Sequence, residues 1–373
     1  MCVKRIALLG CTGSIGTTAL NVIRKYKNEY KLVLIANNNN IEGLKRISSE
    51  FKPDIVFSNS GYLYINNIEK PFDKEFLSRP ETYKNVDIVI NGIVGLAGLA
   101  PTIATLKAGK ILATANKESL VCAGNLINLN LKNYKGEIRP IDSEHSTIWQ
   151  CIGNNKNNVE SLILTASGGA FRNLNKNELV AAKASQALKH PNWVMGKKVT
   201  IDCATLVNKG MEIIEAKHLF GINNIKTIQH NESIIHSLVG MKDGTLIAGL
   251  SNPDMEIPIQ YALTYPERKQ TSIKKLKLEE LGQLNFGKLD EDKFPCLSIC
   301  KKVSKYGDYA GTILNAADEV AVEMYLKDKI GFYEISDFIN SAFHKFGFEG
   351  NINHIDDIYG IDKEVKEYIL RSF

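Results

Sequence analysis

Residues 5–16 read Arg5-Ile-Ala-Leu-Leu-Gly10-Cys-Thr-Gly13-Ser-Ile-Gly16, a run that places three glycines directly after a short apolar segment. The apolar segment predicts a buried strand, and the residues after Gly13 predict the first turn of a helix. Glycines between a strand and a helix let the backbone approach a pyrophosphate at the helix N-terminus. A tight turn without a ligand would use the same glycines, but the position at the start of a strand–helix pattern favours a dinucleotide site.

Short β-branched runs alternate with helical ones from residue 5 to about residue 142. In chain order the predicted elements are Ile6–Leu9, Thr17–Tyr26, Leu32–Ala36, Ile41–Phe51, Ile55–Phe57, Asp87–Ile90, Pro101–Ala108 and Ile111–Ala115. This alternation is typical of a parallel, doubly wound sheet, so we predict an α/β fold that begins with a Rossmann-like dinucleotide-binding domain. Ligands of such sheets lie beyond the carboxyl ends of the strands, and the residues that follow each strand are therefore the candidate site residues.

The rest of the chain is less regular. Strands are expected at Leu162–Thr165, Val199–Asp202, Ser233–Val239 and Thr245–Leu250, and helices at Lys176–Leu188 and Thr205–Leu219. We therefore predict a cofactor domain over 1–142, a central α+β catalytic, metal- and substrate-binding domain over 143–266, a charged linker over 267–295 and a C-terminal helical bundle over 296–373. Within the bundle, Ser336 is the expected N-cap of a helix.

The composition excludes several classes of protein. The chain has 46 Lys and Arg against 41 Asp and Glu, a net charge of +5, but no basic stripe or nucleic-acid-binding module. Its seven cysteines form no Cys-x-x-Cys pair and are typical of reduced thiols in the cytoplasm. The first residues leave no room for a signal peptide, and the longest apolar stretch, Ile93–Leu106, falls short of the about 20 residues of a membrane span. We expect a cytoplasmic protein that binds neither nucleic acid nor membrane.

The predicted strand Leu32–Ala36 is followed by the asparagine run Asn37–Asn40. An NAD-preferring site usually has an acidic residue here, which binds the ribose 2′-hydroxyl. With no carboxylate to repel it, a 2′-phosphate is tolerated, so NADP is favoured, with Asn38 and Asn39 as candidate contacts.

Charged side chains follow two further predicted strands. Asn116, Lys117 and Glu118 come after Ile111–Ala115, where they are either part of a ligand-facing edge or a surface ion pair. Asp142 and Glu144 flank Ser143 where a strand turns into a helix. Carboxylates are the ligands that Mg²⁺ and Mn²⁺ prefer, although Asp and Ser at such a junction are more often helix caps, the interpretation favoured for this segment alone.

Two loops and one helix add candidates. The run Ser167-Gly-Gly169 follows a strand and offers a hydroxyl and bare amides to a phosphate, or forms a tight turn. The loop 189–196 carries Trp193, which is either a lid that excludes water or a core residue. Asn208, Lys209 and Glu212 share one face of a predicted helix. They form either a solvated ion pair or a phosphate-binding cation beside a further metal-binding carboxylate.

Together these segments resemble the 1-deoxy-D-xylulose 5-phosphate reductoisomerase family over nearly the whole chain. The resemblance rests on motifs that occur in the family's order: Gly10-Cys-Thr-Gly-Ser-Ile-Gly16, Gly92-Ile-Val-Gly-Leu-Ala-Gly98, Ala115-Asn-Lys-Glu-Ser119, Asp142-Ser-Glu-His145, Ser167-Gly-Gly169, His190-Pro-Asn-Trp193, Asn208-Lys-Gly-Met-Glu212 and Gln260-Tyr-Ala-Leu-Thr-Tyr-Pro-Glu-Arg268.

The resemblance implies a homodimeric enzyme of the methylerythritol phosphate route to isoprenoids. It would rearrange and reduce 1-deoxy-D-xylulose 5-phosphate to 2-C-methyl-D-erythritol 4-phosphate with NADPH and one divalent cation, Mg²⁺, Mn²⁺ or Co²⁺. The implied catalytic residues are Lys117, Asp142, Glu144, His190 and Glu212, of which Asp142, Glu144 and Glu212 would hold the metal. The implied substrate contacts are Ser143, Ser167, His190, Trp193, Cys203, Asn208 and Lys209. The implied cofactor contacts are Gly10, Thr12, Gly13, Ser14, Ile15, Gly16, Asn38, Asn39, Asn116, Glu118 and Gly196.

The chain departs from the family pattern at three places. Cys203 stands where the family usually has a serine that donates to the phosphate, Ala170 replaces a proline, and Asn37–Asn40 lacks a basic residue that some members have. The alternatives are a semialdehyde or homoserine type of dehydrogenase, which would need no metal, and a regulatory protein that binds NADP without chemistry.

Overall fold

The computed structural model describes residues 3–189, 193 and 195–372, and its contacts group the chain into two compact units. Unit 1 comprises Met1–Ser119, Ile127–Ser146 and Asp254–Ile273, and unit 2 comprises Leu120–Leu126, Thr147–Pro253 and Lys274–Phe373. The units are interleaved in the sequence, whereas the four predicted segments are consecutive. The functional division into those segments stays a prediction.

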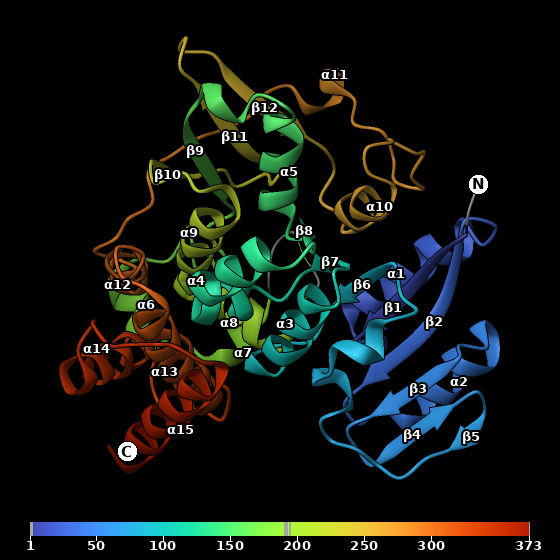
Figure 1. The fold of residues 1–373 in the computed structure, drawn as a ribbon. Coiled ribbons are helices and arrows are strands. Elements are labelled where there is room, and N and C mark those ends of the chain that lie inside the picture. Colours follow the sequence, from blue (N-terminus) through green and yellow to red (C-terminus); the bar gives the residue numbers. More distant parts are fainter. Residues whose placement is uncertain (1–2, 190–192, 194, 373) are drawn as a thin grey trace. The chain divides into compact units, whose positions relative to one another are not determined.

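Unit 1 is built on an eight-stranded sheet with the order β5-β4-β3-β2-β1-β6-β7-β8 (Figure 1). The strands are β1 Lys4–Leu9, β2 Tyr30–Asn37, β3 Ile55–Ser58, β4 Tyr62–Ile65, β5 Ile68–Glu69, β6 Ile88–Asn91, β7 Ile111–Thr114 and β8 Glu137–Pro140. All neighbouring pairs from β3 to β8 are parallel, and β4 and β5 add an antiparallel edge. The predicted parallel, doubly wound sheet is confirmed.

The helices of this part of the chain are α1 Ser14–Lys25, α2 Ile41–Phe51, α3 Leu99–Lys107, α4 Lys117–Asn133, α5 Ser143–Ile152 and α10 Glu256–Thr264. The apolar residues of β1 are fully buried, and two of them, Ile6 and Leu8, belong to a core shared with α1, α2 and α10. A parallel strand covered on both faces needs such an uninterrupted apolar run, which is the pattern that the sequence shows. Because Ile259 and Leu263 of α10 belong to this core, residues 254–273 fold with unit 1.

Strand order reverses at β1, which pairs with β2 on one side and with β6 on the other. The chain proceeds from β1 through β2 to β3 and then returns to β6, so the carboxyl ends of β1 and β6 form the switch point of the sheet. Ligands of doubly wound sheets bind at this point.

Unit 2 has a four-stranded sheet with the order β10-β9-β11-β12. The strands are β9 Val159–Ala166, β10 Ile225–Gln229, β11 Ile235–Met241 and β12 Leu246–Leu250, and β9 pairs parallel with β10 and antiparallel with β11. The helices are α6 Lys176–Val180, α7 Ala184–Ala187, α8 Lys197–Thr205, α9 Val207–Phe220, α11 Leu278–Leu281, α12 Pro295–Val303, α13 Asp308–Leu326, α14 Glu334–Phe346 and α15 Ile355–Ser372. The predicted C-terminal helices are confirmed, and α13 is buried along most of its length.

Three local predictions were wrong. Val199–Asp202 is helical in α8 rather than a strand, with Thr200 N–H donating to Gly196 O and Lys198 paired with Asp202 one turn later. The single helix expected over 176–188 is two short ones, α6 and α7. Ser336 lies inside α14, where its hydroxyl donates to Tyr333 O at 2.6 Å, so the helix begins before it.

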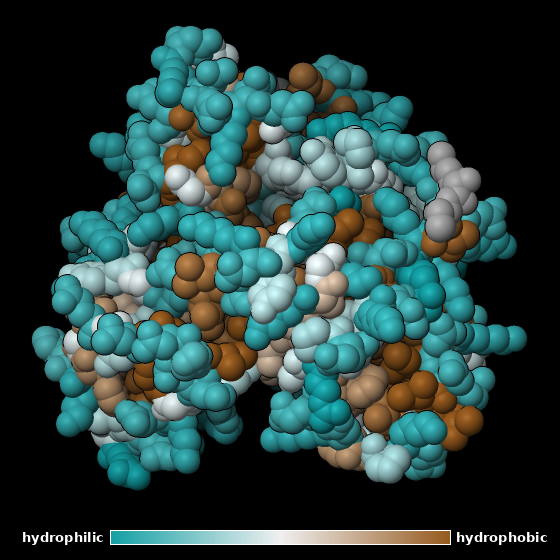
Figure 2. Space-filling model, in the orientation of Figure 1, coloured by the Kyte–Doolittle hydropathy of each residue, from teal (hydrophilic) through white to brown (hydrophobic). Residues whose placement is uncertain are grey.

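The face of the molecule drawn in Figure 2 carries mostly hydrophilic residues, with hydrophobic ones in scattered groups. Among the described helices, none combines the length and the apolar character required to cross a bilayer. The six cysteines among the described residues form no disulfide bond.

Candidate active site

The glycine-rich turn follows β1 at the switch point of unit 1. Gly10 has φ +79°, and a Cβ on it would lie 2.6 Å from the carbonyl oxygen of Gly92, which follows β6. A Cβ on Gly16 would lie 2.4 Å from Gly10 O. Side chains at Gly10 and Gly16 would therefore separate the two turns or push α1 off β1, so both glycines are needed for the turn itself.

The first turn of α1 is open for an anion. Gly13 is its N-cap and offers no side-chain cap, so the first backbone N–H groups of the helix depend on solvent or a ligand. Gly13 and Ser14 are exposed, Thr12 is partly exposed, and Ile15 packs against Gly92. The structure therefore fits a pyrophosphate at the predicted residues, although Gly10, Gly16 and Ile15 also serve packing.

The four asparagines at the end of β2 and directly after it divide into two kinds. Asn37 is buried and donates to Asn40 O at 2.6 Å, and Asn40 caps α2 by accepting Gly43 N–H. Asn38 and Asn39 are exposed, as a cofactor contact requires. The run is thus partly structural, and Asn38 and Asn39 stay candidate contacts.

Asn116 and Glu118 are buried and hold the loop after β6 in shape. The Asn116 amide donates to Ile93 O at 2.8 Å, to Gly95 O at 2.9 Å and to a Glu118 oxygen at 3.0 Å, and Gly95 N–H donates to the other Glu118 oxygen at 3.0 Å. Gly95 has φ +74°, a conformation that favours glycine. Both residues therefore shape the loop at the switch point, whether or not they also touch a cofactor.

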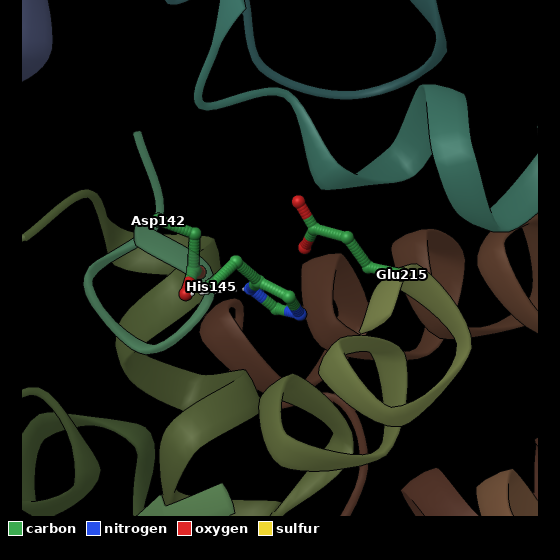
Figure 3. A group of neighbouring side chains, drawn as sticks. All are labelled: Asp142, His145 and Glu215. Carbon is green, nitrogen blue, oxygen red and sulfur yellow. Dashed lines mark hydrogen bonds and ion pairs between the residues drawn. The ribbon is translucent and has the colours of Figure 1, made fainter. Parts of the chain in front are cut away.

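Asp142 is the centre of a charged group at the beginning of α5. Its carboxylate accepts Lys117 Nζ at 2.9 Å and lies 2.9 Å from His145 Nδ1, and Figure 3 draws the Asp142 and His145 side chains turned toward one another. Burial alone would raise the pKa of Asp142, but Lys117 and His145 hold it well below its ordinary value of 3.8. The carboxyl is therefore ionised at neutral pH.

Asp142 also acts as the helix cap that was favoured for this segment alone. The Asp142 carboxylate also accepts a hydrogen bond from Glu144 N–H at 3.1 Å, and the Ser143 hydroxyl donates to the Glu144 carboxylate at 2.6 Å. Asp142, Ser143 and Glu144 are all partly exposed. Capping and ligand binding are therefore compatible, because both carboxylates keep access to solvent.

In unit 2, α9 carries the predicted polar face. The Glu212 carboxylate is 1% exposed and accepts hydrogen bonds from both Asn208 and Lys209. These contacts rule out a solvated surface pair. Glu215, one turn further along α9 and fully buried, is the third side chain drawn in Figure 3 and was not among the predicted residues.

The turn after β9 has the tight form expected of Ser167-Gly-Gly169. Gly168 and Gly169 have φ of +80° and +66°, and Gly169 N–H donates to Ser167 Oγ at 3.3 Å. The Arg172 guanidinium, which the sequence interpretation missed, donates to Ser167 O at 3.3 Å and to Asn231 O. The only feature of the sequence that could have indicated a role for Arg172 is its position, three residues after the two glycines of this turn.

The loop before α8 is described in part. The predicted catalytic residue His190 lies outside the described residues, and Gly196 is the exposed N-cap of α8. Trp193 is partly exposed, and its ring centroid lies 6.0 Å from that of His236, a neighbour that the sequence interpretation also missed.

Comparison with known proteins shows to which protein family a chain with these features belongs. Family models match residues 6–124 (1-deoxy-D-xylulose 5-phosphate reductoisomerase), 138–220 (1-deoxy-D-xylulose 5-phosphate reductoisomerase C-terminal domain) and 250–368 (DXP reductoisomerase C-terminal domain). The 1-deoxy-D-xylulose 5-phosphate reductoisomerases of Clostridium botulinum (strain Loch Maree) and Caldanaerobacter subterraneus subsp. tengcongensis are 42% and 45% identical, with 99% of both chains covered in each case. The chain belongs to the 1-deoxy-D-xylulose 5-phosphate reductoisomerase family.

Solved reductoisomerase structures have the same fold. One, in complex with NADPH, fosmidomycin and magnesium, superposes with a TM-score of 0.92 at 34% identity over 99% of this chain and 98% of that chain. The enzyme from Zymomonas mobilis in complex with NADPH gives 0.89 at 32% identity over 99% and 98%. The predicted fold class and family are confirmed, and the reductoisomerase interpretation is favoured over the dehydrogenase alternative. The roles of individual residues stay predictions.

Proposed function

We propose that this chain rearranges and reduces 1-deoxy-D-xylulose 5-phosphate to 2-C-methyl-D-erythritol 4-phosphate, in the non-mevalonate route to isoprenoid precursors. The observation that carries the proposal is the match over 99% of the chain to reductoisomerases of two bacteria. The charged groups described above support it, because their side chains are buried or partly buried, whereas the side chains of an ordinary surface ion pair are exposed to solvent.

NADPH would be held by unit 1. The open first turn of α1 with Thr12, Gly13 and Ser14 suits the pyrophosphate, and the exposed Asn38 and Asn39 suit the ribose end. NADPH, when bound, supplies the hydride that reduces the rearranged aldehyde. Asn116 and Glu118 would keep the loop after β6 in the shape that the nicotinamide end needs, and Gly196 is a further proposed cofactor contact.

A divalent cation would be held by Asp142, Glu144 and Glu212. These side chains form a candidate cation-binding set, and a second set consists of Asp142, His145 and Glu215. The donor chemistry fits the first set best, since Mg²⁺ and Mn²⁺ prefer carboxylate oxygens, and the ionised state of Asp142 suits a cation. The cation, when bound, supplies a Lewis acid that stabilises negative charge on the substrate oxygens.

Several hydrogen-bond donors would orient the substrate. Lys117 and Ser143 would bind the oxygens of the reacting carbons, with Asp142 holding the Lys117 ammonium in place at 2.9 Å. Ser167, Asn208 and Lys209 would bind the phosphate, because they offer a hydroxyl, an amide and an ammonium. The phosphate is then a remote handle whose binding energy helps to organise the site.

The loop 189–196 would close over the substrate and exclude water. His190, Trp193 and Cys203 are the proposed contacts on this side, with the Trp193 ring already packed against His236. Water exclusion protects a reactive intermediate and strengthens the electrostatic contacts inside the site. We further propose that the protein is cytoplasmic and that it forms a homodimer. Light scattering after gel filtration would test the dimer.

The proposal is tested by following NADPH oxidation with 1-deoxy-D-xylulose 5-phosphate. Turnover should require Mg²⁺, Mn²⁺ or Co²⁺, stop when EDTA is added, resume when the metal is restored, and be much slower with NADH. Turnover that persists after full chelation would point to a dehydrogenase without metal. Absence of turnover with every metal would reject the proposal.

A further inference from the structure

The short helix α8 adjoins each substrate-side feature of unit 2. The loop 189–196 leads directly into its N-terminus, and a single residue, Leu206 in the left-handed conformation at φ +64°, joins its C-terminus to α9. A Cβ on Gly169 would lie 2.5 Å from the carbonyl oxygen of Cys203 and 2.8 Å from Ala204 Cα. The glycine turn thus packs against the last turn of α8, and any shift of α8 moves this turn and the start of α9 together.

A buried ion-pair group ties α8 to α13. Lys198 Nζ lies 2.6 Å from an Asp202 oxygen on the same helix and 2.6 Å from an Asp318 oxygen on α13. The Asp318 side chain is 0% exposed and that of Asp202 5%. One ammonium therefore serves two carboxylates in a site that excludes most water.

Other titratable groups also face Asp318. Burial raises the pKa of Asp318 above its ordinary value of 3.8, and Glu319 beside it on α13 acts in the same direction. The thiols of Cys296 and Cys300 on α12 also face the two carboxylates, and burial raises their pKa so that they stay neutral. Lys198 thus provides the positive charge toward which both carboxylates are directed.

Such a group is an unusual way to fix a helix. Packing alone could hold α8, and apolar side chains of similar size often stabilise a fold as well as a buried ion pair does. The ion pair adds a directional constraint. Its short contacts are compatible with only one position, or register, of α8 along α13, whereas apolar contacts would allow α8 to shift along α13. A helix that carries a binding residue and supports a phosphate-binding turn needs that register.

We propose that Lys198, Asp202 and Asp318 form a positioning network that fixes α8 on α13 and thereby orders the phosphate-binding side of the active site. The inference rests on the proposed function, since it names the residues that hold that same site in shape. None of the three is proposed to touch the substrate.

The test compares two substitutions of one residue. Asp318→Ala removes the link to α13 but leaves the Lys198–Asp202 pair within α8, whereas Asp318→Asn keeps an oxygen that accepts a hydrogen bond from Lys198. We expect Asp318→Ala to raise KM for 1-deoxy-D-xylulose 5-phosphate about tenfold with KM for NADPH changed less than about twofold, because small misplacements of binding groups are costly. Asp318→Asn should leave both constants within about twofold of the wild-type values. Glu291→Ala, which breaks the partly exposed pair with Lys301 in the same unit, is the matched control and should change neither.

Hydrogen exchange of residues 197–205, followed by mass spectrometry, gives a measurement that needs no activity. Exchange should speed up about tenfold in Asp318→Ala and stay at the wild-type rate in Asp318→Asn. If Asp318→Ala does not fold, Lys198→Met cuts the same link from the side of α8 and should show the same pattern.

The outcomes separate the network from the proposed function. Equal effects of the alanine and asparagine variants, a parallel rise of both KM values, or unchanged exchange in α8 would each overturn the network. A wild-type chain that shows no turnover with the sugar phosphate would reject the function, while the exchange comparison would still decide the network.

Discussion

Replacing Gly210 by alanine should push α9 away from α12. Gly210 lies on α9 between Lys209 and Glu212, and an added Cβ would be 2.2 Å from Cys300 Cβ and 2.5 Å from Cys300 Sγ. Ordinary van der Waals contact begins at 3.4 Å, so the two helices must separate by about 1.2 Å (3.4 minus 2.2). Neither partner can yield by rotation, since both atoms that meet at 2.2 Å are Cβ atoms fixed by their backbones.

Two opposite effects decide the stability of this variant. Overpacking of a core costs about 1–3 kcal/mol, whereas alanine stabilises a helix by roughly 1 kcal/mol relative to glycine. The expected net loss is therefore roughly 0–2 kcal/mol. The effect on catalysis should be larger, because the residues on either side of Gly210 are displaced, and a misplacement of about 1 Å can cost roughly a hundredfold in rate.

The assays are thermal unfolding by circular dichroism and steady-state kinetics with the sugar phosphate. Gly360→Ala is the matched control, since Gly360 lies inside α15 with nothing within 4 Å of an added Cβ, and it should stabilise the protein by roughly 0.5–1 kcal/mol with normal kinetics. Adding Cys300→Gly to Gly210→Ala removes both clashing atoms and should recover much of the lost activity. The reasoning is refuted if Gly210→Ala is as stable and active as Gly360→Ala, or if the double variant recovers nothing.

Three further predictions test single side chains. Glu212→Gln should lower kcat by roughly a hundredfold or more while NADPH binding, followed by fluorescence titration, stays intact; normal turnover would remove Glu212 from the metal site. Cys203→Ser should lower KM for the sugar phosphate about fivefold, because a hydroxyl is a stronger donor than a thiol; an unchanged or raised KM would show that the thiol is not at the phosphate. Burial raises the pKa of Asp318 in the folded state although Lys198 opposes the rise, so ionising this carboxyl costs more in the folded protein than in the unfolded chain, and stability is lost as the pH rises from 3.8 through the folded value. Asp318→Asn should therefore show a smaller loss of unfolding free energy, measured in urea, as the pH is raised above 3.8, and parallel curves for both proteins would contradict the assignment.

Sequence patterns succeeded wherever the cause of the structure is local. The apolar run of β1, the glycines after it and the strand–helix alternation predicted a parallel sheet, since each strand needs an apolar run and each turn a permissive backbone. Helical periodicity also placed Asn208, Lys209 and Glu212 on one face of α9, where the structure pairs them.

The same patterns failed where contacts between segments distant in the sequence determine the local structure. Val199–Asp202 has the β-branched residues of a strand, yet it is helical, because α8 packs against both α9 and α13 and Lys198 of the same helix pairs with Asp318, 120 residues away. Tertiary context overrides a weak local preference of this kind.

By itself the sequence determined the fold class, the glycine turn, the family and the residue types of the candidate site, because backbone preference and hydrophobic period act between near neighbours. Only the tertiary structure decided that α10 completes the core of unit 1, that Asn116 and Glu118 hold the loop after β6, and that Gly210 faces Cys300. The physical reason is that burial and short-range contacts depend on which segments of the chain pack together. The local periodicity of the sequence does not determine which segments those are.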